Sequence, residues 1–133
     1  MAFARRVFTI AGIYGIVVLL PQYFLEDRIG RDNPPPITHA ENFYGFIGTA
    51  LAWQVLFLLI ARDPARYRPA MLPAVLEKLA FSGAVIVLFA QGRLAASLLG
   101  FGLVDLTFAV LFVAAYLRVA QSRGWETGPR LDH

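Results

Sequence analysis

The sequence predicts an all-α integral membrane protein, a four-helix bundle with both the N-terminus and the C-terminus in the cytoplasm. Two observations of composition lead to this fold class. Of the 133 residues, 58% are hydrophobic and 16% are charged, whereas soluble domains carry about a quarter charged residues. The charges are also segregated, and long runs of the chain contain almost none. Four of these runs approach the roughly 20 residues that a helix needs to cross a bilayer.

The four apolar segments are predicted to be helices, because polar backbone groups cannot stay unpaired in hydrocarbon. They form a single domain and cover residues 7–24, 43–61, 72–90 and 95–117. The first segment resembles a signal peptide, since two arginines precede it. However, the bulky sequence LLPQYFLED stands where a cleavage site would need small residues. A retained first helix is therefore expected.

The third segment is interrupted by Glu77 and Lys78, and two interpretations follow. Either residues 72–90 cross the bilayer with the charged pair in the first turns near the surface, or only the uncharged second part enters as a re-entrant helix. The full span is favoured, because a lysine can extend its stem toward the surface. Pro73 also suits the start of a helix.

The arginines predict the orientation, because positive residues concentrate in cytoplasmic segments. With the N-terminus inside, eight arginines face the cytoplasm and three face the opposite side. The inner set is Arg5, Arg6, Arg62, Arg66, Arg68, Arg118, Arg123 and Arg130, and the outer set is Arg28, Arg31 and Arg93. Near the inner surface, a charge cluster is expected from Arg62, Arg66, Arg68, Glu77 and Lys78, in which Glu77 pairs with a lysine or arginine such as Arg66 or Arg68.

Polar groups of all four segments lie near one depth, because counting at about 1.5 Å per residue places them within roughly 5 Å of each other. Asp105 is the most costly of them, at about 2.5–3.5 kcal/mol for an aspartate at the centre of a span. We expect Asp105 to point inward and to be hydrogen-bonded by Tyr14, Gln54 or Ser82, directly or through water. No Lys, Arg or His is predicted at this depth, so a cation meeting Asp105 would come from a ligand or another subunit.

Three roles are open for this central layer. It can act only as polar glue between helices, it can line a ligand cavity, or it can take part in proton transfer or catalysis. Under the second role the predicted ligand-binding residues are Asp105, Gln54, Tyr14, Trp53 and Ser82. Trp53 either packs inside the bundle or faces the ligand.

Small residues spaced four apart predict close approach of the helices. Such pairs are Ala11 with Gly15 and Gly48 with Ala52, and Gly45 also lies four residues before Thr49. The alternative is that these glycines leave room for a flat apolar ligand.

The connection at residues 25–42 contains a run of three prolines, which favours an extended chain. It ends in His39 and Glu41, at the outer mouth of the second segment. This pair is either solvated or forms a gate above the cavity. Because His39 and His133 are the only histidines and the chain has no cysteine, we expect no metal site, no haem and no other cofactor. Nothing in the charge distribution indicates nucleic acid binding.

The layout resembles small bacterial four-helix membrane families such as the DoxX-like proteins and, more distantly, the EXPERA-type bundles. The resemblance lies in four spans with a buried acid, and in the stretches YGFIGTALAWQVLFLLIARDPARYRP, LEKLAF and DLTFAVLFVAAYLR. It implies a multi-pass protein of the bacterial inner membrane. EXPERA-type proteins bind or isomerise sterol-like molecules with intramembrane acids, and Asp105 is compatible with such a role.

These observations predict a small non-catalytic membrane protein. It is either an accessory subunit of a larger membrane complex, whose partners are other membrane subunits, or a binder of a lipid, quinone or other apolar ligand around Asp105. The alternative is a membrane enzyme or a proton-coupled carrier that acts on a lipophilic substrate.

Overall fold

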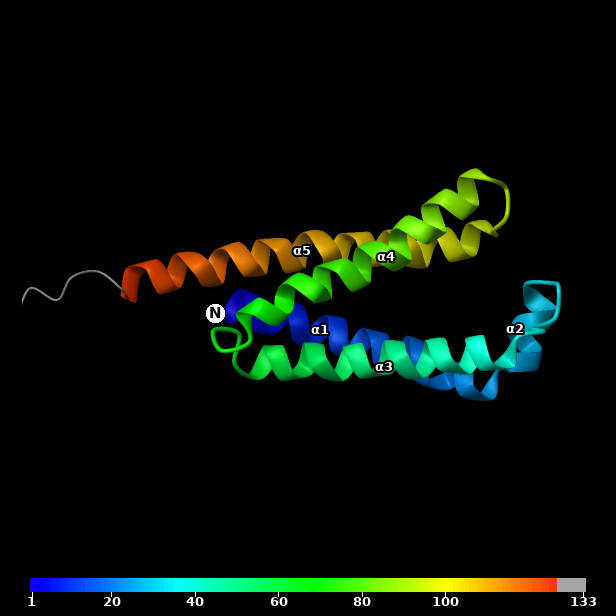
Figure 1. Cartoon of the computed structure of the whole chain (residues 1–133), viewed down its shortest axis with the longest axis horizontal. Helices are drawn as coiled ribbons and strands as arrows, with labels where there is room; N and C mark the ends of the chain where they lie inside the picture. The colour runs from blue at the N-terminus through cyan, green and yellow to red at the C-terminus, as the bar shows by residue number, and fades with distance from the viewer. Residues whose placement is uncertain (127–133) are drawn as a thin grey trace, which may run out of the picture.

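The computed structural model describes residues 1–126, with side chains through Val119, and this part of the chain is helical without strands. Four long helices are joined by shorter ones (Figure 1). The long helices are α1 (Ala2–Leu19), α3 (Ala40–Arg62), α4 (Met71–Ala90) and α5 (Ala96–Glu126). The short ones are α2 (Glu26–Asp32) and the 3₁₀ helices η1 (Leu20–Phe24) and η2 (Arg68–Ala70). Arg130 and His133 lie outside the described residues, and the side chain of Arg123 lies outside the described side chains.

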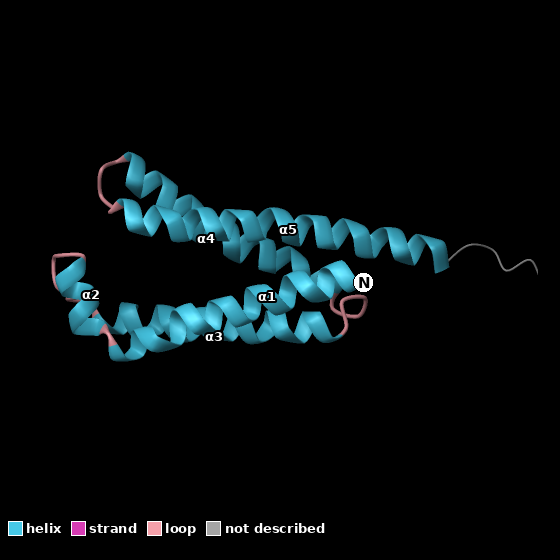
Figure 2. Cartoon of the chain, turned by 180° about the vertical axis from the view of Figure 1, so that it is seen from behind, coloured by secondary structure: helices cyan, strands magenta, loops and turns pink. Residues whose placement is uncertain are grey.

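The long helices form two antiparallel pairs. Helix α1 packs along α3, and α4 packs along α5, while α1 also contacts α5 between the pairs. Figures 1 and 2 both show the pairs close together at the N-terminus and splayed apart toward α2 and the α4–α5 turn. The contact between the two pairs is therefore concentrated at one end.

Aromatic rings hold the two pairs together at the closed end. Phe8 of α1, Phe57 of α3 and Phe112 of α5 are fully buried. The Phe8 and Phe112 rings stack with centroids 4.2 Å apart, and the Phe57 ring meets Phe112 edge-on at 5.0 Å. In a bilayer such contacts stabilise helix association through van der Waals packing, because lipid tails are as apolar as the side chains.

Four helical stretches are long and apolar enough to cross a membrane, which indicates a multi-pass membrane protein. They are Ala2–Phe24, Ala40–Arg62, Arg68–Ala90 and Ala96–Val119. They cover the four predicted segments, except that the fourth begins one residue later. The third stretch is continuous and has 23 residues, which fits a full span rather than a short re-entrant helix.

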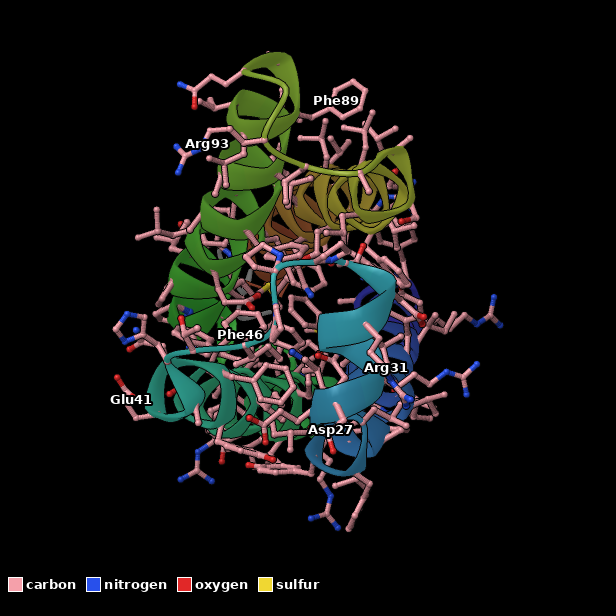
Figure 3. All side chains as sticks on the ribbon, turned by 90° about the vertical axis from the view of Figure 1, so that its right-hand side faces the viewer. Asp27, Arg31, Glu41, Phe46, Phe89 and Arg93 are labelled. Carbon is pink, nitrogen blue, oxygen red and sulfur yellow. The ribbon has the colours of Figure 1, made fainter. Side chains whose placement is uncertain are left out.

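The segment between α1 and α3 is more ordered than the predicted extended connection. Residues 20–24 form η1 and residues 26–32 form α2, while Leu25 and residues 33–39 lack regular structure. Tyr44 on α3 donates a hydrogen bond to Glu26 Oε2 on α2 over 2.7 Å, which ties the short helix to the long one. Figure 3 looks onto this end of the molecule, where α2 carries Asp27 and Arg31 in front of the long helices.

Candidate functional site

A cavity of about 550 Å³ lies where the helix pairs splay apart. It is lined by residues of α1, η1, α2, α3, α4 and α5, and also by Asn33. Leu25 and Ile29 line it from the side of α2, and most of the remaining wall is aliphatic or aromatic. Its charged lining residues are Glu77, Lys78 and Asp105, which we call the charged cluster. The cavity is thus largely apolar, with charge gathered in one place.

The charged cluster is held together by the ammonium group of Lys78. Lys78 Nζ donates a hydrogen bond to Asp105 Oδ1 over 3.3 Å and lies 3.7 Å from Glu77 Oε2. The three side chains are buried, with exposed fractions of 4% for Lys78, 13% for Asp105 and 17% for Glu77. Because all three are shielded from water, their charges interact more strongly than at a protein surface.

Two aromatic faces complete the surroundings of Lys78. Its Nζ lies 5.2 Å from the centroid of the Phe57 ring and 5.7 Å from that of Phe108. Such distances allow cation–π attraction, which is stronger where water is excluded. Lys78 therefore contacts carboxylates and aromatic faces and does not extend to the surface.

The expectation that no cation of the chain reaches Asp105 is wrong, because Lys78 is that cation. The error arose from the assumed start of the third span. The apolar stretch begins at Arg68 rather than at residue 72, so Lys78 lies ten residues, or about 15 Å, along it. From there the stem extends sideways to α5, and the resulting ion pair offsets part of the desolvation cost of both groups.

The five charges predicted to cluster at the inner surface are not brought together by the described ion pairs. Glu77 does pair with a lysine, but that lysine is its neighbour Lys78 within the cavity. Arg68 instead donates its Nε–H to the Tyr116 carbonyl over 3.1 Å, and its guanidinium lies 3.6 Å from the Tyr116 ring centroid. The remaining two arginines, Arg62 and Arg66, are exposed. The Arg66 guanidinium lies 5.5 Å from the centroid of the Tyr67 ring, and Arg62 makes no described ion pair.

Three of the five predicted ligand-binding residues line this cavity, namely Tyr14, Gln54 and Asp105. The hydrogen bonds differ from those expected around Asp105, whose described donor is Lys78. Gln54 Nε2 donates a hydrogen bond to the Ala50 carbonyl over 2.9 Å. The Tyr14 ring packs against the Phe108 ring, with centroids 5.6 Å apart.

The other two predicted residues do not line the cavity. Ser82 is buried and donates to the Leu79 carbonyl of its own helix over 3.3 Å. Trp53 packs against the core, with its ring 6.5 Å from that of Phe57. Of the two roles open for Trp53, packing is therefore the one that the structure shows.

Gln54 has a feature that the sequence did not indicate. The side chain is 1% exposed, and its Oε1 has no hydrogen-bond partner among the described residues. The amide packs against Gly15 of α1, so closely that a Cβ on Gly15 would overlap it. Because Nε2 is held by Ala50, Oε1 is fixed in place as an unpaired acceptor.

His39 and Glu41 lie at the start of α3 and form an exposed pair, with His39 Nδ1 3.2 Å from Glu41 Oε1. Neither residue lines the cavity, so their geometry matches a solvated pair rather than a gate. Among the described residues, no group of three His, Cys, Asp or Glu side chains could hold a metal ion.

Comparison with known proteins adds no assignment, since no protein-family model, curated protein or solved structure matches this chain. A largely apolar cavity with buried charges can hold a lipophilic molecule by its body and orient it by its head group.

Proposed function

We propose that this chain is a small non-catalytic membrane protein that binds an apolar ligand between its two helix pairs. The observation that carries the proposal is the cavity of about 550 Å³ whose lining combines apolar walls with the charged cluster. This volume lies within the roughly 300–1,000 Å³ typical of small-molecule sites. Intramembrane charges that face a cavity commonly mark such sites, because burying them without a function is costly.

The ligand test uses matched tryptophan variants of one helix. Leu98 of α5 lines the cavity, whereas Leu103 of the same helix is 48% exposed and does not line it. After mild detergent extraction, native mass spectrometry is expected to show a retained small molecule on the unaltered chain and on Leu103→Trp. Leu98→Trp should retain less of it, because the larger indole takes up part of the cavity. A ligand-free chain, or equal retention by both variants, would contradict the proposal.

Two competing functions give different results in the same preparation. An accessory subunit would co-purify with other membrane proteins in constant proportion. A membrane enzyme or proton-coupled carrier is supported by the burial of Glu77, Lys78 and Asp105 within the apolar stretches, since such groups also serve as proton relays. That function predicts loss of turnover or transport in Asp105→Asn with retained folding and retained ligand.

We further propose that the four long helices form a bundle in a bacterial inner membrane, with both ends of the chain in the cytoplasm. The excess of arginines on the inner side supports this orientation. Since the chain contains no cysteine, single cysteines can report it. A membrane-impermeant maleimide is expected to label Thr38→Cys in intact cells and Arg62→Cys only after permeabilisation. The reverse pattern would show the opposite orientation.

A further inference from the structure

We infer that the ligand of this cavity is a lipophilic cation, an apolar molecule whose ammonium head group lies at the charged cluster. The inference rests on the proposed function and specifies its ligand class. Three observations lead to it: the charge balance of the lining, the kind of polar atom left unpaired, and the character of the walls.

The charges of the lining do not balance. Among its residues, Glu77 and Asp105 are acidic and Lys78 is the only basic side chain. With all three ionised, the cavity carries one uncompensated negative charge. An unpaired charge away from water is costly, and the cost is relieved when a positive group binds beside it. A cationic head group therefore completes the cluster, whereas an anionic one would add to the excess.

The buried polar side-chain atoms left unpaired in the described residues are both acceptors. They are Gln54 Oε1 and Glu77 Oε2, and Glu77 Oε2 lies 3.7 Å from Lys78 Nζ, beyond hydrogen-bond distance. Both residues line the cavity, but Gln54 Oε1 faces Gly15 of α1, so the carboxylate of Glu77 is the acceptor available to a bound head group. Unpaired buried acceptors favour a ligand with N–H donors. A quinone offers only carbonyl acceptors, and a fatty-acid carboxylate is an acceptor that also carries negative charge, so neither fits this lining.

The walls suit an apolar body and a positive head. Phe46, Phe81 and Phe101 contribute rings to the cavity, and the Phe46 and Phe81 rings stack with centroids 6.1 Å apart across α3 and α4. In Figure 3, Phe46 projects from α3 toward the space between the two helix pairs. Aromatic faces attract cations as well as hydrocarbon, so they accept both parts of such a ligand.

The test compares three probes with the same hydrocarbon chain: dodecylamine, dodecan-1-ol and dodecanoate. Each radiolabelled probe is added to the protein in nanodiscs of zwitterionic lipid, and binding to nanodiscs without protein is subtracted as bilayer partitioning. We expect dodecylamine to bind about tenfold more tightly than the alcohol, and dodecanoate not to bind measurably. Glu77→Gln removes the unbalanced charge and leaves the Lys78–Asp105 pair intact. It should reduce amine affinity to that of the alcohol.

Circular dichroism serves as the folding control, since Glu77→Gln should keep the helical signal of the unaltered chain. Equal binding of all three probes, or an amine preference that survives in Glu77→Gln, would overturn the inference and leave ligand binding as such intact. If no probe binds above protein-free nanodiscs and none displaces the retained molecule, the head-group assignment fails. If the unaltered chain also retains no molecule, the proposed function fails with it.

Discussion

Replacing Lys78 by methionine is expected to destabilise the folded chain by about 3–5 kcal/mol, the cost of removing one partner from a buried ion pair. The substitution keeps most of the apolar stem, so the packing of α4 changes little. It leaves Asp105 and Glu77, which are 13% and 17% exposed, without a counter-ion. Titration of the protein from mild detergent into a denaturing detergent, followed by circular dichroism, gives the change in the free energy of unfolding.

A compensated variant separates lost charge balance from lost packing. Combining Lys78→Met with Glu77→Gln and Asp105→Asn removes every charge of the cluster and keeps the side-chain shapes. This triple variant should recover more than half of the lost stability, since amides cost less to bury than carboxylates. If Lys78→Met alone changes stability by less than about 1 kcal/mol, the ion pair contributes little to the stability of the fold.

Gly15→Ala is expected to destabilise the chain by about 1–3 kcal/mol, the usual range for adding a methyl group to a packed interface. Gly15 of α1 lies against the Gln54 amide of α3, and the new Cβ would overlap the amide oxygen. Gln54 is 1% exposed and its Nε2 is bonded to Ala50, so the side chain has little room to move. The same detergent titration measures the loss in the free energy of unfolding. We expect this loss to come from weaker packing between α1 and α3.

Gly83→Ala is the matched control, because a Cβ at Gly83 of α4 would meet no atom within 4 Å. The same change in an open helical position removes the extra backbone freedom of glycine from the unfolded chain. It should therefore be neutral or stabilise by up to about 1 kcal/mol. Equal effects of Gly15→Ala and Gly83→Ala would show that the α1–α3 contact is not close-packed.

The long helices could be predicted because their length and apolar character stand out in the sequence. In a chain with long runs of almost uncharged residues, length and apolarity are enough to locate the helical stretches. Helix α2 was not predicted, since its sequence EDRIGRD carries no apolar run. Its position follows from a contact distant in sequence, the hydrogen bond between Tyr44 and Glu26.

Part of the site could be predicted, because the position of a residue along its span gives the depth of its side chain. Counting depth placed Tyr14, Gln54 and Asp105 at one level, and the structure places all three on one cavity. Depth alone does not give direction around a helix axis, so Ser82 and Trp53 were included although they point elsewhere. Lys78 was missed because the third span was predicted to begin at residue 72 rather than at Arg68, which placed its ammonium group near the surface.

The two residues of the ion pair come from consecutive helices, α4 and α5, which are joined by a connection of only five residues. Helix α5 by itself would carry the unneutralised charge of Asp105 into the lipid during biogenesis, whereas α4 carries Lys78 beside Glu77. If the two enter together as a hairpin, Lys78 and Asp105 neutralise each other before they leave the aqueous translocation machinery. We therefore expect α5 to insert poorly when it is synthesised without α4, so that α4 acts as an insertion partner for the helix that follows it.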